Sequence, residues 1–123
     1  MKYILALISF LFLSAADAQS VPFTTDYELV AASQTTQVIG PQSATSTLSV
    51  GDILEEVLII PEATTAGTVA IKDGGDTAIN IFITGTLVDT KPFVVKLGAR
   101  SRSGAWQITT GASVHAIAIG RFK

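Results

Sequence analysis

The clearest structural signal in this chain is the stretch Gly104-Ala-Trp-Gln-Ile-Thr-Thr-Gly-Ala-Ser-Val-His-Ala-Ile-Ala-Ile-Gly-Arg-Phe122. Its first half alternates the apolar Trp106 and Ile108 with polar residues, a Thr/Gly/Ala/Ser turn follows, and an apolar run ends at Gly120. Alternation, a glycine-containing turn and β-branched residues are typical of two paired strands. The stretch therefore predicts an antiparallel hairpin.

The second strand of this hairpin is apolar on both predicted faces. The two faces are His115, Ile117 and Ile119 on one side, and Val114, Ala116 and Ala118 on the other. Such a strand is usually central in its sheet or covered on its second side. The small residues are expected either to contact a second subunit or to form a sparsely apolar outer face, and both alternatives stay open.

Shorter strand-like runs precede this stretch at regular spacing. They are Tyr27–Ala32, Ile53–Ile60, Thr68–Lys72, Ala78–Thr84 and Pro92–Leu97. The segment Asp73-Gly-Gly-Asp76 predicts a turn between two of them. Six or seven short strands with turn signals about every 8–12 residues predict an all-β fold, an antiparallel jelly-roll-like β-sandwich in a single domain.

Period-two alternation predicts which side chains of these runs point inward. They are Val69 and Ile71 in the third run, Ile79, Ile81 and Ile83 in the fourth, and Phe93, Val95 and Leu97 in the fifth. In the second run, Glu55 and Glu56 are adjacent, so a regular strand sends them to opposite faces. That geometry makes them a poor catalytic acid pair.

The N-terminus has the three parts of a secretory signal peptide. Lys2 supplies positive charge, residues 4–13 are apolar, and Ala16-Asp-Ala18 has the small-x-small pattern of a cleavage site. The apolar run is much shorter than the roughly 20 residues of a membrane-spanning helix. We expect residues 1–18 to be cleaved, with membrane contact only through an uncleaved N-terminal segment. Residues 19–45 are expected to form a polar N-terminal arm with the first strand, and residues 46–123 the sandwich core.

Composition excludes several classes of protein. The formal net charge is −2, which argues against nucleic acid as a partner. The chain has no cysteine, whereas small exported domains are commonly stabilised by disulfides. Its single asparagine, Asn80, is not part of a glycosylation sequon. These features favour a bacterial or bacteriophage origin.

Few residues in the chain are suited to catalysis or metal binding. His115 is the only histidine, and because no acidic residue is next to it in the sequence, a strand-end or interface role is favoured over a catalytic triad. Zinc sites need several His or Cys ligands. Asp73 and Asp76 supply only two carboxylates for calcium, so a plain turn is favoured there. We therefore expect no enzymatic activity, no catalytic or metal-binding residues, and no cofactor.

One candidate binding surface remains. Lys96, Arg100 and Arg102 form a basic group near Trp106, and such a group could contact a sugar, a phosphate or an acidic partner. Exposed arginines in a loop are also commonly just solvated, and this alternative stays open.

Five segments together carry a resemblance to a known group of proteins. They are Ala32–Gly40, Gly51–Ile59, Ala70–Ile79, Ser101–Gly111 and Val114–Phe122. Taken together and in this order, the five segments resemble small all-β proteins encoded in bacteriophage and prophage genomes. The resemblance implies a virion decoration or attachment protein, a homo-oligomer or a partner among phage capsid or tail proteins, and no catalytic residues to carry over.

The signal-like N-terminus departs from this group, because virion proteins usually assemble in the cytoplasm. It predicts export to the periplasm or the medium, whereas without a working signal the virion is the expected location. The alternative function is an exported β-sandwich that binds cell-surface glycan or a protein partner, using Trp106 and the basic loop.

Overall fold

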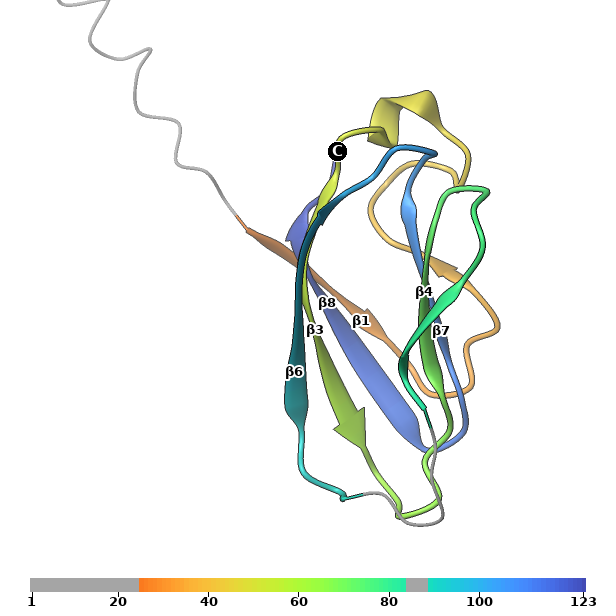
Figure 1. The fold of residues 1–123 in the computed structure, drawn as a ribbon, viewed down its shortest axis with the longest axis vertical. Helices are drawn as coiled ribbons and strands as arrows, with labels where there is room; N and C mark the ends of the chain where they lie inside the picture. Colours follow the sequence, from red (N-terminus) through yellow and green to blue (C-terminus); the bar gives the residue numbers. More distant parts are fainter. Residues whose placement is uncertain (1–24, 84–88) are drawn as a thin grey trace, which may run out of the picture.

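Two antiparallel sheets packed face to face form the structure, a computed structural model that describes residues 25–83 and 89–123 (Figure 1). The elements are β1 (Asp26–Val30), β2 (Gln37–Val38), a 3₁₀ helix (Thr47–Ser49), β3 (Ile53–Pro61), β4 (Val69–Asp73), β5 (Ile79–Phe82), β6 (Phe93–Arg100), β7 (Trp106–Thr110) and β8 (Val114–Arg121). Within these two ranges no helix has the length and apolar character needed to cross a membrane. The predicted signal peptide, residues 1–18, lies outside the described residues.

The strand order is that of a jelly roll. Sheet A has the order β1-β8-β3-β6 and sheet B the order β2-β7-β4-β5. Only β4 and β5 are consecutive strands of the same sheet; each of the other connections passes from one sheet to the other. Eight strands divided in this way form a double-sheet jelly roll. The predicted all-β antiparallel sandwich is confirmed.

The predicted C-terminal hairpin is wrong. β7 pairs with β2 and β4 in sheet B, whereas β8 pairs with β1 and β3 in sheet A. The turn after Thr110 therefore carries the chain across the sandwich. A glycine-containing turn shows that the chain reverses direction, but it does not determine whether the two strands pair with each other.

Both alternatives expected for the small residues of β8, a subunit contact and a sparsely apolar outer face, are wrong, because these residues face the core. Val114, Ala116 and Ala118 are fully buried between the sheets, and His115, Ile117 and Ile119 lie on the outer face. β8 is central in sheet A, as its apolar character predicts. Its small side chains share one buried cluster with larger residues, such as Leu54 of the neighbouring strand β3 and Ile108 of sheet B.

The core lies between the sheets and draws on both. Its largest fully buried side chains are Ile39, Leu54, Ile59, Ile108, Val30, Val57, Val69 and Val114. Val30 ends β1 and Ile39 directly follows β2. The polar segment 19–45 therefore supplies one edge strand of each sheet.

Two bulges change the predicted alternation. In β3 the register shifts between Leu54 and Glu56, so Glu55 and Glu56 both lie on the outer face and not on opposite faces. In the β4–β5 pair the register shifts opposite Ile81, so that Ile81 and Phe82 both pack against the core. Ile79 and Ile83 are largely exposed, at 63% and 68%. The inward positions predicted in β4 are confirmed, with Val69 and Ile71 buried. In β6 the prediction is confirmed for Val95 and Leu97, which pack on the core, but Phe93 is 37% exposed.

Both open sides of the sandwich are closed by contacts between its edge strands. On one side, Glu28 of β1 accepts hydrogen bonds from Gln37 Nε2 and from the Gly40 backbone N–H, each at 2.8 Å. On the other side, the rings of Phe82 and Phe93 lie 5.5 Å apart and join β5 to β6. The two sheets are thus joined at their margins as well as through the core.

Candidate functional site

Trp106, the aromatic member of the predicted binding surface, is a core residue. It is 6% exposed, and its indole Nε1 donates a hydrogen bond to the carbonyl oxygen of Asp52 (3.2 Å). Trp106 begins β7 with its side chain pointing into the sandwich, where a ligand cannot stack on the ring. The glycan surface predicted from the sequence therefore lacks its aromatic platform.

Asp52 joins three parts of the chain at one end of sheet A. Besides the Trp106 indole, its backbone carbonyl accepts the Ser101 N–H (2.8 Å), and its Oδ1 accepts the Lys123 N–H (3.1 Å). Ser101 in turn donates its hydroxyl hydrogen to the carbonyl of Ser49 (2.6 Å). The start of β3, the end of β6 and the C-terminal segment are thereby held together.

The carboxyl group of Asp52 is buried beneath this end of the molecule. Burial raises its pKa, while the backbone N–H of Lys123, the neighbouring Ser49 and the charge of Lys123 lower it less strongly. Ser49 Oγ and Asp52 Oδ2 are both buried, and neither has a partner in hydrogen-bond geometry among the described residues. Ionisation of Asp52 therefore costs folding free energy.

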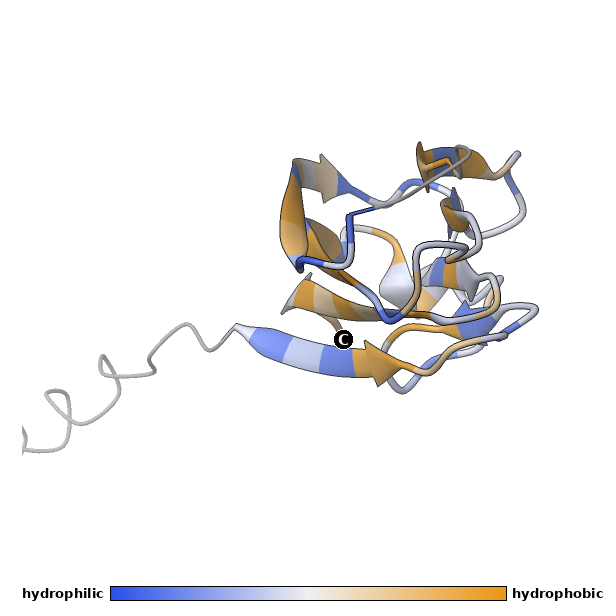
Figure 2. Cartoon of the chain, turned by 90° about the horizontal axis from the view of Figure 1, so that it is seen from below, coloured by the Kyte–Doolittle hydropathy of each residue, from blue (hydrophilic) through white to orange (hydrophobic). Residues whose placement is uncertain are grey.

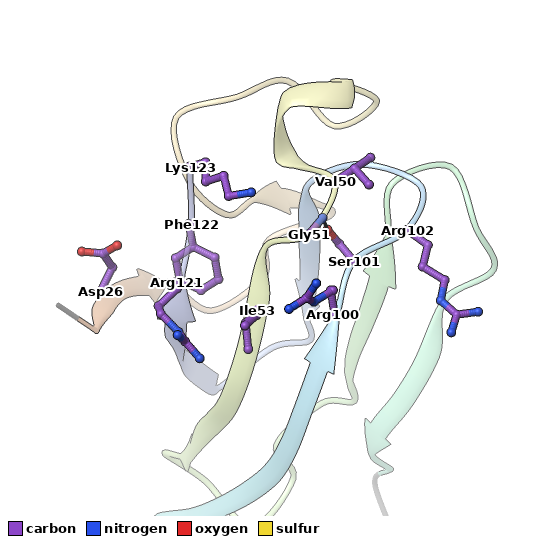
Figure 3. A pocket seen from close by; sticks show the side chains of 10 residues that line it. All are labelled: Asp26, Val50, Gly51, Ile53, Arg100, Ser101, Arg102, Arg121, Phe122 and Lys123. Atoms are coloured by element: carbon purple, nitrogen blue, oxygen red, sulfur yellow. Dashed lines mark hydrogen bonds between the residues drawn. The ribbon is translucent and has the colours of Figure 1, made fainter. Parts of the chain in front are cut away.

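A shallow hollow of about 820 Å³ opens at the same end of the sandwich (Figure 3). Ile53 and Phe122 supply apolar surface to it, and its basic lining residues are Arg100, Arg102, Arg121 and Lys123. Asp26 is the acidic lining residue. The charged residues of the hollow are therefore mostly basic, while most of its exposed lining surface is apolar.

Arg100 and Arg121 flank Ile53 in one row across sheet A. Ile53 pairs with Arg100 of β6 on one side and with Arg121 of β8 on the other. Since neighbouring strands are about 4.8 Å apart, the two arginine backbones are about 10 Å apart on the same face. In Figure 3 their guanidinium groups lie on either side of Ile53, whereas Arg102 projects away from them.

The positive charge at the hollow is only partly neutralised. Arg121 Nε lies 3.4 Å from Glu55 Oε1, and both side chains are about two-fifths exposed. This contact uses Nε, and Glu55 lies where the register of β3 shifts, two residues after the outward-facing Ile53. Arg100 and Lys123 form no ion pair within the part of the chain that the structure describes.

The structure brings together only part of the surface predicted from the sequence. Arg100 and Arg102 line the hollow, but Lys96 lies farther along β6 on the outer face, opposite Glu56. Arg121 and Lys123 were not predicted to belong to the site. Because these residues approach Arg100 through the pairing of β8 and β6 with β3, local sequence patterns contain no signal that would reveal them.

The Asp73–Asp76 segment is a turn, as predicted, and its carboxylates bind the chain itself. Asp73 accepts hydrogen bonds from the backbone N–H groups of Arg102 (2.6 Å) and Ser103 (3.1 Å). Asp76 accepts the Ser103 hydroxyl (2.8 Å). In residues 25–83 and 89–123 no three His, Asp or Glu side chains gather as metal ligands.

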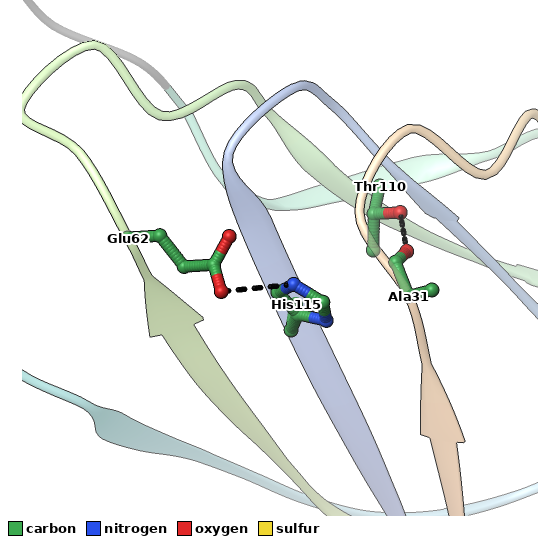
Figure 4. A network of polar contacts seen from close by, with 4 residues as sticks. All are labelled: Ala31, Glu62, Thr110 and His115. Atoms are coloured by element: carbon green, nitrogen blue, oxygen red, sulfur yellow. Dashed lines mark hydrogen bonds and ion pairs between the residues drawn. The ribbon is translucent and has the colours of Figure 1, made fainter.

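His115 lies beside an acidic residue that its sequence neighbours do not reveal. Its Nε2 is 3.0 Å from Glu62 Oε1, at the end of β8 opposite the hollow. Figure 4 shows this pair apart from the hydrogen bond of Thr110, whose hydroxyl donates to the Ala31 carbonyl (2.6 Å). The pair joins β8 to the residue that follows β3.

The outer face of sheet A carries an apolar row that crosses all four strands. In the strand register, Leu29 of β1 lies opposite Ile117 of β8, Ile117 opposite Leu58 of β3, and Leu58 opposite Val94 of β6. We call these four residues the apolar row. Leu29 is 55% and Val94 46% exposed, and Tyr27 beside the row is 77% exposed. Figure 2 shows β1 changing from hydrophilic at its start to apolar at the end that carries Leu29.

Comparison with protein-family models, curated proteins and solved structures gives no match to this chain. The basic hollow and the apolar row, at different positions on the outer face of sheet A, are therefore the features from which its function can be inferred.

Proposed function

We propose that the protein is a non-enzymatic structural module of the virion decoration or attachment type, which binds a protein surface of a phage particle through the apolar row. The row is the observation that carries the proposal. An antiparallel sheet with one face in water normally presents polar residues on that face. Here four aliphatic side chains lie in register across the whole sheet, with the aromatic Tyr27 beside them.

Binding through the apolar row is favourable because it removes exposed apolar surface from water. Burial contributes about 25 cal/mol per Å² of apolar area, so an exposed sheet face is a favourable docking surface. Contiguous exposed apolar patches on soluble proteins commonly mark interaction sites. The resemblance of the five segments to phage-encoded all-β proteins supports a capsid or tail protein, or a second copy of this chain, as the partner.

The test is density-gradient centrifugation of a lysate, with mass spectrometry following this chain and the major capsid protein. We expect the wild type to sediment with particles, and the double variant Leu29→Thr/Val94→Thr to remain at the top of the gradient. Ile79→Thr is the matched control, because Ile79 is equally apolar and exposed but belongs to sheet B. A wild-type chain that is monomeric and never sediments with particles would refute the proposal.

The same fractions test the proposed location. A chain found in the periplasm or the medium that begins at Gln19 would establish export, and the virion role would then be abandoned for the exported binding module. A chain that begins at Met1 and occurs in particle fractions would establish the virion as its location.

A further inference from the structure

We propose that the basic hollow binds a phosphate or sulfate ester, with Arg100, Arg121 and Lys123 holding the anionic group. This site does not depend on the apolar row or on the proposed virion role. It follows from the charge, the geometry and the rigid mounting of three side chains that come together only in the folded chain.

The first argument is charge. The chain has a net charge of −2, yet the hollow gathers Arg100, Arg102, Arg121 and Lys123 against one acidic lining residue, Asp26. A concave surface lined by one sign of charge concentrates its field and attracts ions of the opposite sign. The ligand should therefore be an anion.

The second argument is the number and placement of donors. A guanidinium group presents a planar fork of N–H donors, and a single fork can satisfy both oxygens of a carboxylate. Arg100 and Arg121 approach the space over Ile53 from opposite sides, and Lys123 supplies an ammonium group from the C-terminal segment. Donors on several sides suit a tetrahedral oxyanion, which has oxygens pointing in several directions. This geometry favours phosphate and sulfate over carboxylate.

The third argument is the rigid frame beneath the cations. The Lys123 N–H is bound to Asp52, and the Gly51 N–H is bound to both the carbonyl and the hydroxyl oxygen of Ser101, each at 3.1 Å. Arg100 and Arg121 are the last residues of their strands. Side chains mounted on fixed backbone lose less freedom on binding than side chains of a mobile loop.

The fourth argument is the apolar part of the hollow, which indicates an organic carrier for the anionic group. Phe122 lines the hollow and packs in part against the core, where a Cβ at position 120 would lie 2.9 Å from its ring. Together with Ile53 and the 41% exposed Val50, this ring offers a surface for carbon atoms next to the cations. A phosphate or sulfate ester of an organic group would contact both the cations and the apolar surface.

The test is a titration of the ¹⁵N-labelled protein, followed by NMR at constant ionic strength. The probes are glucose 6-phosphate, glucose 6-sulfate and, as the uncharged control, glucose. We expect saturable shifts of the Gly51, Arg121 and Phe122 amide signals with at least one ester and none with glucose. Saturation by only one ester identifies the ligand class, and saturation by both shows that the site recognises the shared oxyanion.

Variants identify the groups that bind. Because hydrogen bonds between charged groups are among the strongest in proteins, Arg100→Gln and Arg121→Gln should each weaken binding about tenfold or more. Lys96→Gln is the control, because Lys96 lies on the same strand and the same outer face as Arg100 but outside the hollow; it should change the affinity less than twofold. Glu55→Gln should tighten binding severalfold, because it removes the carboxylate that competes for Arg121.

Three results would overturn the proposal: no saturable shift with either ester, equal shifts with glucose, or equal losses of affinity in Arg100→Gln and Lys96→Gln. Each variant is checked first for an unchanged spectrum of the core residues. A failed titration would leave the apolar row and its particle test unaffected.

Discussion

Gly67 and Gly111 lie backbone against backbone, so that a Cβ on Gly67 would come within 2.6 Å of the Gly111 Cα atom. The Gly67 N–H donates to the Ala112 carbonyl (2.7 Å) and the Gly111 N–H to the Thr68 carbonyl (2.8 Å). The β4–β7 ladder is thus extended to the point where the chain leaves sheet B for sheet A. Only glycine allows the two backbones to approach this closely.

Gly111→Ala should lower the free energy of unfolding by about 1–3 kcal/mol, because the added methyl group meets backbone atoms that cannot move aside. Urea unfolding followed by Trp106 fluorescence measures the loss. Gly75→Ala is the matched control, since a Cβ at Gly75 has no neighbour within 4 Å. Equal unfolding midpoints for the two variants would contradict the close packing.

Glu28→Ala should loosen the side of the sandwich where β1 and β2 meet. The substitution leaves Gln37 and the Gly40 N–H without their shared carboxylate, which should lower the free energy of unfolding by about 1–3 kcal/mol. Hydrogen exchange of the Gly40 amide should accelerate relative to the wild type. Glu62→Ala, which removes only the exposed partner of His115, should cost less than about 1 kcal/mol. If the Gly40 amide keeps its protection in Glu28→Ala, the carboxylate does not close this side.

Asp52→Asn should change how stability depends on pH. Since burial raises the pKa of Asp52 in the folded protein, the unfolded chain releases its proton first as the pH rises from about 4. Ionisation of Asp52 therefore lowers the free energy of unfolding of the wild type between pH 3 and neutral pH. The asparagine variant has no carboxyl group at this position, so it does not show this decrease.

Thermal unfolding of the wild type and of Asp52→Asn between pH 3 and pH 7 measures this difference. The variant should gain stability relative to the wild type as the pH rises, and the gap should be constant once Asp52 is ionised in both states. Asp26→Asn, at an exposed position, is the control. If the stability of Asp52→Asn instead falls relative to the wild type as the pH rises, ionised Asp52 stabilises the fold.

The sequence was sufficient to predict the fold class, because alternation and turn residues report strands and reversals directly. Val95 and Leu97 point inward as their spacing predicts. The errors have two physical causes. The bulges at Glu55 and Ile81 each insert one residue that reverses the alternation, and no residue type marks them in the sequence. The partner of a strand is chosen by packing between segments far apart in the chain, so β7 and β8 separate despite their short connection.

The residues of the candidate site, like the fold, could be predicted from the sequence only in part. Arg100 and Arg102 were found because they are neighbours in the sequence, but Arg121 joins them only through the strand register around Ile53. Trp106 was included in the predicted binding surface because it closely follows Arg100 and Arg102 in the sequence. Its burial depends on the opposing sheet, which local spacing does not describe.

The position of β8 in the middle of sheet A has a consequence for biosynthesis. β1 and β3 are translated long before β8, yet each pairs with β8 and not with the other. While residues 114–121 are still inside the ribosome, sheet A has a gap at its centre and the buried side chains of β3 have no complete wall to pack against. Sheet A of the growing chain therefore stays incomplete until β8 has left the ribosome, and the apolar surface of β3 is open to aggregation until then. A nascent chain arrested before Val114 should be digested by protease along its whole length.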